Sequence, residues 1–319
     1  MKLVIQIPCY NEEECLPVTL NEIPKSFPGI DSYEILIIDD GSTDKTVEVA
    51  RSFGIKNILL NGRNLGLSRT FYKGLSKSLE LGADIIVNID ADNQYYAKDI
   101  GKLIEPIIAG KVDIAVGSRP FDKIKYFSAA RKMLQKFGSF LVKIVTGQDI
   151  KDATSGFRAF SKEAALKVNI FSSYTYTLET IIQACNIGLK IISVPVKVNE
   201  DKLRNSRLIK NTYLYTQRGF LSVLRALVVY KPLKVFSLLS LFFIVLGSIF
   251  LGRYLYFYFL KVYGHIPSVV IGTFLILFSL ILFIGGLFSH LISINRRIIE
   301  ENQYNLRKIL LDLKKNNNQ

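Results

Sequence analysis

The chain has 319 residues, which is enough for one large domain and a smaller appendage. Its net charge of +14 is uneven: residues 1–200 carry +2, whereas residues 201–319 carry +12, from 16 Lys/Arg and 4 Asp/Glu. A nucleic-acid-binding protein is expected to carry its basic surface on the folded domain, but here the excess flanks apolar runs, where it suits anionic lipid head groups. We therefore expect no nucleic-acid partner.

Cysteine and histidine are too few and too scattered to form a zinc site or a disulfide framework. The chain has three cysteines, Cys9, Cys15 and Cys185, and two histidines, with no C-x-x-C pair. We interpret the cysteines as reduced groups in a cytoplasmic domain. The apolar N-terminal run covers about six residues, which is too short for a signal peptide.

The first 120 residues alternate between strand-like and helix-like segments. Apolar runs at 3–8, 33–40, 56–61, 83–90 and 112–117 predict five strands, and helices are expected at 12–25, from 42 onward, at 65–81 and at 100–109. This rhythm of continuous Val/Ile/Leu strands and helices indicates an α/β fold with a mostly parallel sheet that is covered on both sides. In such sheets the ligand lies beyond the carboxyl ends of the strands.

Residues 121–200 are less regular. They predict helices at 128–146 and 177–186, and strands at 157–160 and 190–198. The last strand contains a proline, so we expect it near an edge of the sheet.

The following segment predicts contact with a membrane. Residues 208–230 form an amphipathic pattern that is typical of an interfacial helix, although an ordinary surface helix packed on the domain has the same pattern. Residues 235–252 and 267–289 carry no charge, and each is close to the roughly 20 residues that a helix needs to cross the hydrocarbon core.

The distribution of Lys and Arg predicts the orientation of these spans. The loop 253–266 carries two Lys/Arg, whereas the flank 201–234 carries eight and the tail 293–319 carries six. The positive-inside rule then places the N-terminal domain and the tail in the cytoplasm of a multi-pass membrane protein. We expect four parts: an N-terminal domain at 1–200, a basic loop and interfacial helix at 201–234, two transmembrane helices at 235–292, and a basic tail at 293–319.

Three acidic clusters end predicted strands. They are Pro-Cys-Tyr-Asn-Glu at 8–12, Asp-Asp-Gly-Ser-Thr-Asp at 39–44, and Asp-Ala-Asp-Asn-Gln at 90–94. Parallel topology brings strand ends to one edge, where carboxylates can hold a metal on a diphosphate and accept hydrogen bonds from a nucleoside. Each cluster alone is weak evidence for a functional site, since Asp-Asp-Gly-Ser is also typical of an ordinary turn before a helix.

Together these clusters resemble glycosyltransferase family 2, with its GT-A nucleotide-sugar fold. The segments 117–119 (Gly-Ser-Arg) and 155–158 (Ser-Gly-Phe-Arg), and the pair of C-terminal spans, resemble its dolichyl-phosphate mannosyltransferase and polyprenyl-phosphate glucosyltransferase branch. The resemblance covers roughly residues 2–295. It implies an inverting, Mg²⁺- or Mn²⁺-dependent transfer from a UDP- or GDP-sugar to a polyisoprenyl phosphate at the cytoplasmic membrane face, making a lipid-linked sugar donor for glycan or glycoprotein assembly.

The resemblance also implies roles for individual residues. Pro8, Tyr10 and Glu12 would line the nucleotide pocket, and Asp39 or Asp40 would read the base. Asp90 would face the ribose or the diphosphate and contribute to the metal site, where Asp92 and Gln94 would bind the ion. The family has other residue types where Asn93, Tyr95 and Tyr96 stand, which leaves the details of the donor open.

The acceptor requires cations rather than a base. A phosphate monoester is largely dianionic at pH 7, and guanidinium groups suit its geometry. The family holds this phosphate with arginines, so Arg119, Arg131 and Arg158 are candidates, with Arg204 in a basic loop over the site; a solvated surface charge is the alternative for each. Glu179 matches a family acid that would orient an arginine, and Asp152 is similarly located; either could be purely structural.

Two other functions stay open. A processive polysaccharide synthase would carry a Q-x-x-R-W motif, but this chain has no Trp. A non-catalytic nucleotide-binding membrane scaffold would not need the acidic clusters. The sequence does not identify the sugar, and it leaves open a homo-oligomer.

Overall fold

The structure is a computed structural model that describes residues 1–120, 129–170, 176–199, 224, 227–262 and 264–317. The chain divides into two compact units, Met1–Val223 with Gln303–Gln319, and Leu224–Asn302. We describe each unit separately.

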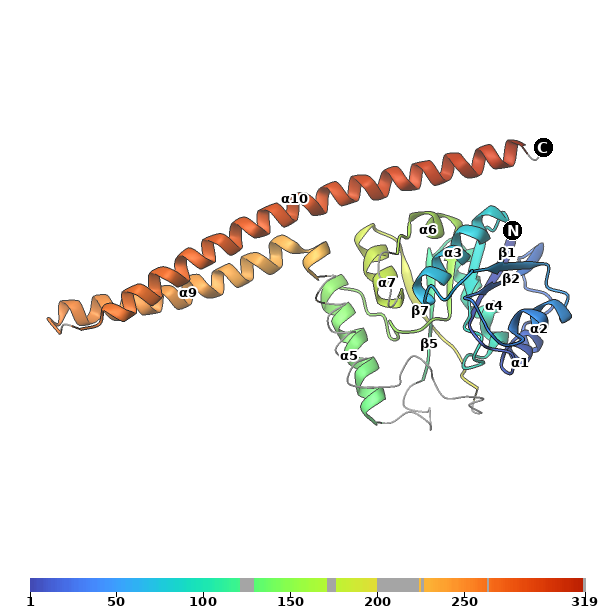
Figure 1. The fold of residues 1–319 in the computed structure, drawn as a ribbon, viewed down its shortest axis with the longest axis horizontal. Helices are drawn as coiled ribbons and strands as arrows, with labels where there is room; N and C mark the ends of the chain where they lie inside the picture. Colours follow the sequence, from blue (N-terminus) through green and yellow to red (C-terminus); the bar gives the residue numbers. More distant parts are fainter. Residues whose placement is uncertain (121–128, 171–175, 200–223, 225–226, 263, 318–319) are drawn as a thin grey trace. The chain divides into compact units, whose positions relative to one another are not determined.

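The first unit is built on a seven-stranded sheet with the strand order β3-β2-β1-β4-β6-β5-β7 (Figure 1). The strands are β1 (Lys2–Cys9), β2 (Ser32–Asp39), β3 (Asn57–Leu60), β4 (Ile85–Asn88), β5 (Ile114–Ser118), β6 (Arg158–Ser161) and β7 (Ile191–Pro195). Neighbouring strands run parallel, except that β6 is antiparallel to both β4 and β5. The mostly parallel sheet is confirmed, and β7, which ends on a proline, lies at the edge as predicted.

Helices connect the strands. In chain order they are α1 (Leu16–Glu22), α2 (Thr46–Ser52), α3 (Leu67–Glu80), η1 (Ala97–Asp99), α4 (Ile100–Ile108), α5 (Ala129–Thr146), α6 (Lys162–Lys167) and α7 (Thr177–Asn186). The first helix is shorter than the predicted 12–25, because residues 12–15 form a turn before it begins. The second begins at Thr46 rather than near Ser42, since residues 41–45 form the loop after β2. Helix α6 was not predicted.

Alternating residues of β1 point to opposite faces of the sheet. Leu3, Ile5 and Ile7 join the core with residues of α1 and α4. On the other face, Gln6 donates to the carbonyl oxygen of Phe71 in α3. Both faces of the strand are therefore covered, which explains why its sequence reads as a continuous apolar run.

The end of the last helix, α10 (Ile266–Asn317), belongs to the first unit from Gln303 onward. Arg307 donates to the carbonyl oxygens of Leu166 (2.9 Å) and Val168 (3.3 Å) at the end of α6. It also bonds to Tyr72 of α3 and to Asn169. Cationic groups suit the free carbonyls at the end of a helix. This part of the predicted basic tail is thus packed against α3 and α6.

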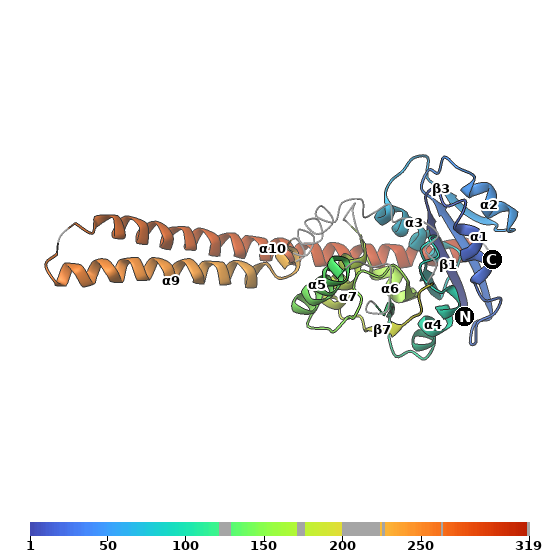
Figure 2. The same cartoon turned by 90° about the horizontal axis from the view of Figure 1, so that it is seen from below.

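The second unit contains an antiparallel helix pair, α9 (Pro232–Phe259) with the first part of α10 (Figures 1 and 2). The helices approach closely where Gly247 meets Gly272: a Cβ atom added to Gly247 would lie 2.9 Å from the Gly272 carbonyl oxygen. Close approach at small residues is typical of helix pairs in lipid. Both helices are long and apolar enough to cross a membrane. In the most apolar 18-residue stretch of each helix, only 11% (α9) and 17% (α10) is buried. They include the two predicted spans, whereas the predicted interfacial helix at 208–230 lies mostly outside the described residues.

Candidate functional site

The parallel strands β1, β2 and β4 end beside one another, and their following loops line a cavity of about 230 Å³. The lining residues come from all three acidic clusters, from the loop before α3 and from the first turn of α3: Pro8, Cys9, Tyr10, Glu12, Asp40, Asn64, Gly66, Leu67, Thr70, Asp90, Ala91 and Asp92. The structure therefore brings together the clusters that the sequence placed at strand ends.

The two acids that end β2 have different partners. The Asp40 carboxylate accepts hydrogen bonds from the Asn61 side chain (3.0 Å) and from the backbone N–H groups of Leu65 (2.9 Å) and Gly66 (2.9 Å). Asp39 accepts from Gly41 and Ser42 through Oδ2, while its buried Oδ1 has no hydrogen-bond partner among the described residues. Asp40 thus fixes the loop before α3, and Asp39 keeps an acceptor available.

The loops after β1 and β2 are tied together. Asn11, which has a positive φ of 55°, receives a hydrogen bond on its Oδ1 from the Thr43 backbone (2.7 Å), and its own N–H donates to Ser42 (2.8 Å). Asn is one of the few residues that adopt this conformation readily. Next to it, the Glu12 N–H donates to Thr46 (2.7 Å), and the residue is buried at 7% exposure.

Asp90 is the most strongly perturbed acid of the site. Burial raises its pKa to about 7, helped by the nearby Asp92 charge and partly offset by Arg119. Its Oδ1 is buried without a partner among the described residues, and its Oδ2 would lie 2.5 Å from a Cβ atom added to Gly156. Only glycine leaves room for the carboxylate at this position.

Asp92 lies in a turn that is closed by its own carboxylate, since Oδ1 accepts from the Gln94 N–H (3.2 Å). Asp92 and Asp90 both line the cavity. Mg²⁺ commonly binds one or two carboxylates together with phosphate oxygens, so this pair fits an ion held jointly with a diphosphate. No group of three His, Cys, Asp or Glu suited to a metal occurs within the described part of the chain.

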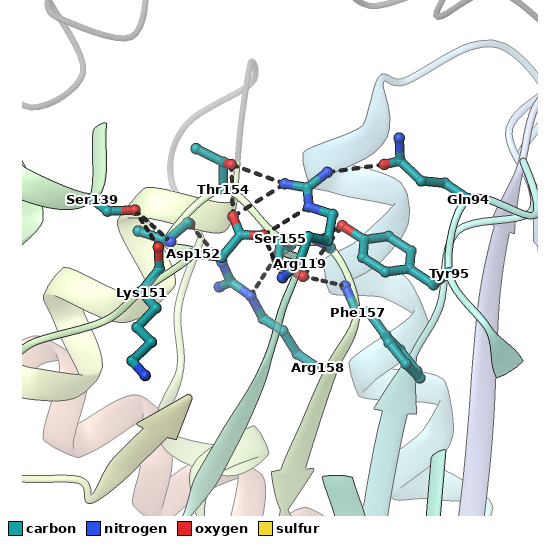
Figure 3. Close-up of polar contacts among 12 residues, drawn as sticks. Gln94, Tyr95, Arg119, Ser139, Lys151, Asp152, Thr154, Ser155, Phe157 and Arg158 are labelled. Atoms are coloured by element: carbon teal, nitrogen blue, oxygen red, sulfur yellow. Dashed lines mark hydrogen bonds and ion pairs between the residues drawn. The ribbon is translucent and has the colours of Figure 1, made fainter. Parts of the chain in front are cut away.

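Gln94 faces Arg119 rather than open space. Its Oε1 accepts a hydrogen bond from Arg119 Nη1 (2.9 Å; Figure 3). Metal ligation by this oxygen would have to use its second lone pair, since one already accepts the hydrogen bond from Arg119. The predicted metal role of Gln94 stays a prediction, and its observed contact links the Asp92 turn to Arg119.

Arg119 is held by a buried carboxylate. Its Nε and Nη2 donate to Asp152 Oδ2 (2.7 Å) and Oδ1 (3.1 Å), Nη2 also reaches Thr154 (3.1 Å), and the guanidinium lies over the Tyr95 ring (Figure 3). Arg119 is 6% exposed and Asp152 is fully buried. Asp152 therefore orients an arginine, one of the two roles that its sequence position left open.

Arg158 is fully buried and bonds mainly to a nearby loop. It donates to the carbonyl oxygens of Ser155 (2.8 Å) and Ala153 (2.9 Å) and to the Thr180 hydroxyl (2.5 Å). These bonds support the segment that contains Gly156. Direct contact of Arg158 with an acceptor phosphate stays a prediction, and its burial favours a supporting role.

The other two predicted arginines cannot be compared with the site. Arg131 lies in α5, but its side chain is outside the described set, and Arg204 lies outside the described residues altogether. Their roles stay predictions.

Two residues near the site were not predicted from the sequence. Tyr95 is buried, and its hydroxyl accepts from the Gly156 N–H (3.1 Å) and from Ser155 (3.2 Å). Asn199 donates to Asn93 beside the Asp92 turn. The sequence around Asn199 contains no pattern that predicts a contact with Asn93, because the two residues lie far apart along the chain.

Comparison with known proteins identifies the family. The sequence model described as glycosyl transferase family 2 matches residues 4–168, just over half of the chain. The chain is 33% identical to the UDP-N-acetylglucosamine–dolichyl-phosphate N-acetylglucosaminyltransferase of Methanococcus voltae, over 60% of this chain and 83% of that protein. It is 28% identical to the undecaprenyl-phosphate mannosyltransferase of Micrococcus luteus, over 65% and 88%.

A solved structure shares the fold. Glucosyl-3-phosphoglycerate synthase from Mycobacterium tuberculosis, determined with Mn²⁺ and UDP, superimposes with a TM-score of 0.54 over 70% of this chain and 79% of that one, at 19% sequence identity. This likeness confirms the GT-A fold of the first unit. The chain belongs to glycosyltransferase family 2, and its relatives match the polyisoprenyl-phosphate branch of that family.

Proposed function

We propose that this glycosyltransferase moves a sugar from a UDP- or GDP-sugar to a polyisoprenyl phosphate, with inversion at the anomeric carbon. The observation that carries the proposal is the convergence of Asp40, Asp90 and Asp92 on one cavity. One carboxylate oxygen of Asp90, and one of Asp39 next to Asp40 in the chain, is buried without a partner among the described residues. The names of the relatives supply the acceptor class, since two of them act on undecaprenyl or dolichyl phosphate.

The donor would lie along the cavity. Asp39, whose Oδ1 has no partner among the described residues, would accept an N–H of the base; it directly precedes Asp40, which lines the cavity together with Tyr10. Asp90 and Asp92 would hold Mg²⁺ or Mn²⁺, which supplies positive charge to the leaving diphosphate. Asp40 acts indirectly, because its hydrogen bonds fix Gly66 and Leu65 at the cavity wall.

The acceptor phosphate needs orientation rather than deprotonation, because it is already largely ionised at neutral pH. Arg119 has two bonds to Asp152, so its guanidinium has a fixed direction before any ligand arrives. Arg131 and Arg204 remain the candidates for direct contact with the phosphate. Preorganised cations of this kind lower the barrier by positioning the nucleophile against the anomeric carbon.

We also propose that the helix pair of the second unit spans a membrane with the catalytic domain on the cytoplasmic side. The excess of Lys and Arg outside the 253–266 loop supports this orientation. A cysteine introduced at Val262 or at Ser52, in a background that lacks Cys185 and keeps the buried Cys9 and Cys15, tests it by labelling sealed cells. Labelling of the Ser52 variant from outside would contradict the orientation.

The decisive experiment uses the full chain in detergent. Purified protein is incubated with a panel of UDP- and GDP-sugars and a polyprenyl phosphate, and the lipid is analysed by mass spectrometry. We expect one sugar to be added to the phosphate. Growth of a polymer would favour a processive synthase, and metal-dependent nucleotide binding without transfer from any donor would favour a scaffold.

A further inference from the structure

The turn that contains Asp92 has an unusual backbone. Asn93 adopts a left-handed conformation with φ of 53° and is 6% exposed. Asn adopts this conformation more readily than other residues with a side chain, but it remains uncommon, and contacts from the surroundings can hold it in place. Asn93 lies between Asp92 and Gln94, and the Gln94 N–H donates to the Asp92 carboxylate (3.2 Å). The conformation of Asn93 therefore positions the N–H group that this carboxylate accepts from.

Asn199 supplies the contacts that hold this conformation. Its side-chain Nδ2 donates to both the carbonyl oxygen and the Oδ1 of Asn93, each at 3.0 Å. The same nitrogen lies 3.2 and 3.3 Å from the two carboxylate oxygens of Glu22 in α1. One amide group therefore joins the turn to a charged acceptor on a helix, and hydrogen bonds to charged acceptors are stronger than neutral ones.

The backbone around Asn199 reinforces the contact. Its own N–H donates to the Gln94 carbonyl oxygen (3.1 Å), Val198 forms an antiparallel bridge with Tyr95, and the Tyr96 N–H donates to Lys197 (3.3 Å). The segment after β7 thus runs along residues 94–96. On the other side, the Gln94 side chain accepts from Arg119. The turn is held from both sides.

We propose that Asn199 is a positioning residue for the metal site: it locks Asn93 in the left-handed conformation and so aims Asp92 at the ion. The inference depends on the proposed metal role of Asp92. Asn199 itself does not line the cavity.

The test measures metal binding apart from catalysis. Mn²⁺ is titrated, with electron paramagnetic resonance detection, into the full-length protein saturated with UDP or GDP, whichever stabilises the wild type. We expect Asn199→Ala to raise the Mn²⁺ concentration for half-saturation about tenfold. The matched control is Asn57→Ala, which removes a similar amide–carboxylate bond, 2.7 Å to Glu34, at the other end of the sheet. The control should lower thermal stability by a similar amount and leave Mn²⁺ binding unchanged.

A second variant tests the route through residue 93. Glycine adopts the left-handed conformation without a steric cost, so Asn199→Ala should weaken Mn²⁺ binding much less in an Asn93→Gly background. Equal weakening in both backgrounds, unchanged Mn²⁺ binding in Asn199→Ala, or a loss of folding that Asn93→Gly does not restore would each overturn the inference. If the wild type itself shows no Mn²⁺-dependent nucleotide binding, the proposed metal role fails instead.

Discussion

Arg119 and Asp152 form a bidentate ion pair in the interior of the catalytic domain, with Nε–Oδ2 and Nη2–Oδ1 distances of 2.7 and 3.1 Å. The side chains are 4% and 0% exposed. Through Gln94 the same guanidinium reaches the turn of Asp92. The pair therefore connects the strand β5 to the proposed metal site.

Removing either partner should destabilise the protein strongly, because the other is left as an uncompensated buried charge. We expect Asp152→Ala and Arg119→Ala each to lower the free energy of unfolding by about 3–5 kcal/mol, and Arg119→Lys not to restore it, since lysine lacks the planar fork. Chemical denaturation in detergent measures the change. Lys143→Ala, which breaks the exposed pair with Asp149, is the control and should cost less than about 1 kcal/mol.

Asp92→Ala should abolish transfer and remove metal-dependent nucleotide binding while leaving the fold intact. Asp92 is partly exposed at the cavity, and its loss removes one backbone hydrogen bond within the turn. Thermal shift with and without Mn²⁺ and nucleotide measures the binding. Asp149→Ala, at an acid exposed on the surface, is the control. Full activity of the Asp92 variant at saturating donor would rule out the metal role.

The sequence predicted the sheet well because both of its faces are covered, so that β1, β2 and β4 read as continuous apolar runs. It also predicted which acids meet, since strand ends of a parallel sheet share one edge. Short elements were harder to predict. Helix α6 has six residues and few turns in which a periodic pattern can appear.

Individual partners in the site could not be predicted from local patterns. Asp39 and Asp40 are neighbours with the same side chain, yet only the loop 61–66, brought in by tertiary folding, saturates Asp40. Arg158 belongs to a sequence motif that predicted contact with the acceptor phosphate. It begins β6, however, which lies between β4 and β5 inside the sheet, so its side chain is buried. Asn199 acts on a residue more than 100 positions away.

Arg307 should stabilise the catalytic domain, although it lies near the C-terminus. Arg307→Ala removes bonds to two carbonyl oxygens, to Tyr72 and to Asn169. We expect a loss of about 1.5–3 kcal/mol in the free energy of unfolding, the usual range for hydrogen bonds to a charged group. Asn305→Ala, on the exposed side of the same helix, is the control and should be neutral. Equal stability of the two variants would show that the docking of the tail contributes nothing.

Asp90 should make the metal-free protein less stable as the pH rises. Its pKa is raised to about 7 by burial, so between about pH 4 and 7 the folded state keeps a proton that the unfolded chain has lost. The folded state binds more protons in this range, and stability therefore falls until the pH passes 7. The full penalty, on the order of 4 kcal/mol, is present at pH 8.

Asp90→Asn removes the charge and keeps the shape, so the variant should be more stable than the metal-free wild type at pH 8 and similar to it at pH 4. Denaturant titrations at both pH values in a chelator measure this difference. Mn²⁺ with nucleotide should then stabilise the wild type at pH 8, because the ion favours the ionised carboxylate, and should stabilise the variant far less. The variant should also lose transfer. If the wild type and Asp90→Asn show the same dependence of stability on pH, the carboxyl group of Asp90 does not titrate between pH 4 and 8. The raised pKa of Asp90 would then be wrong.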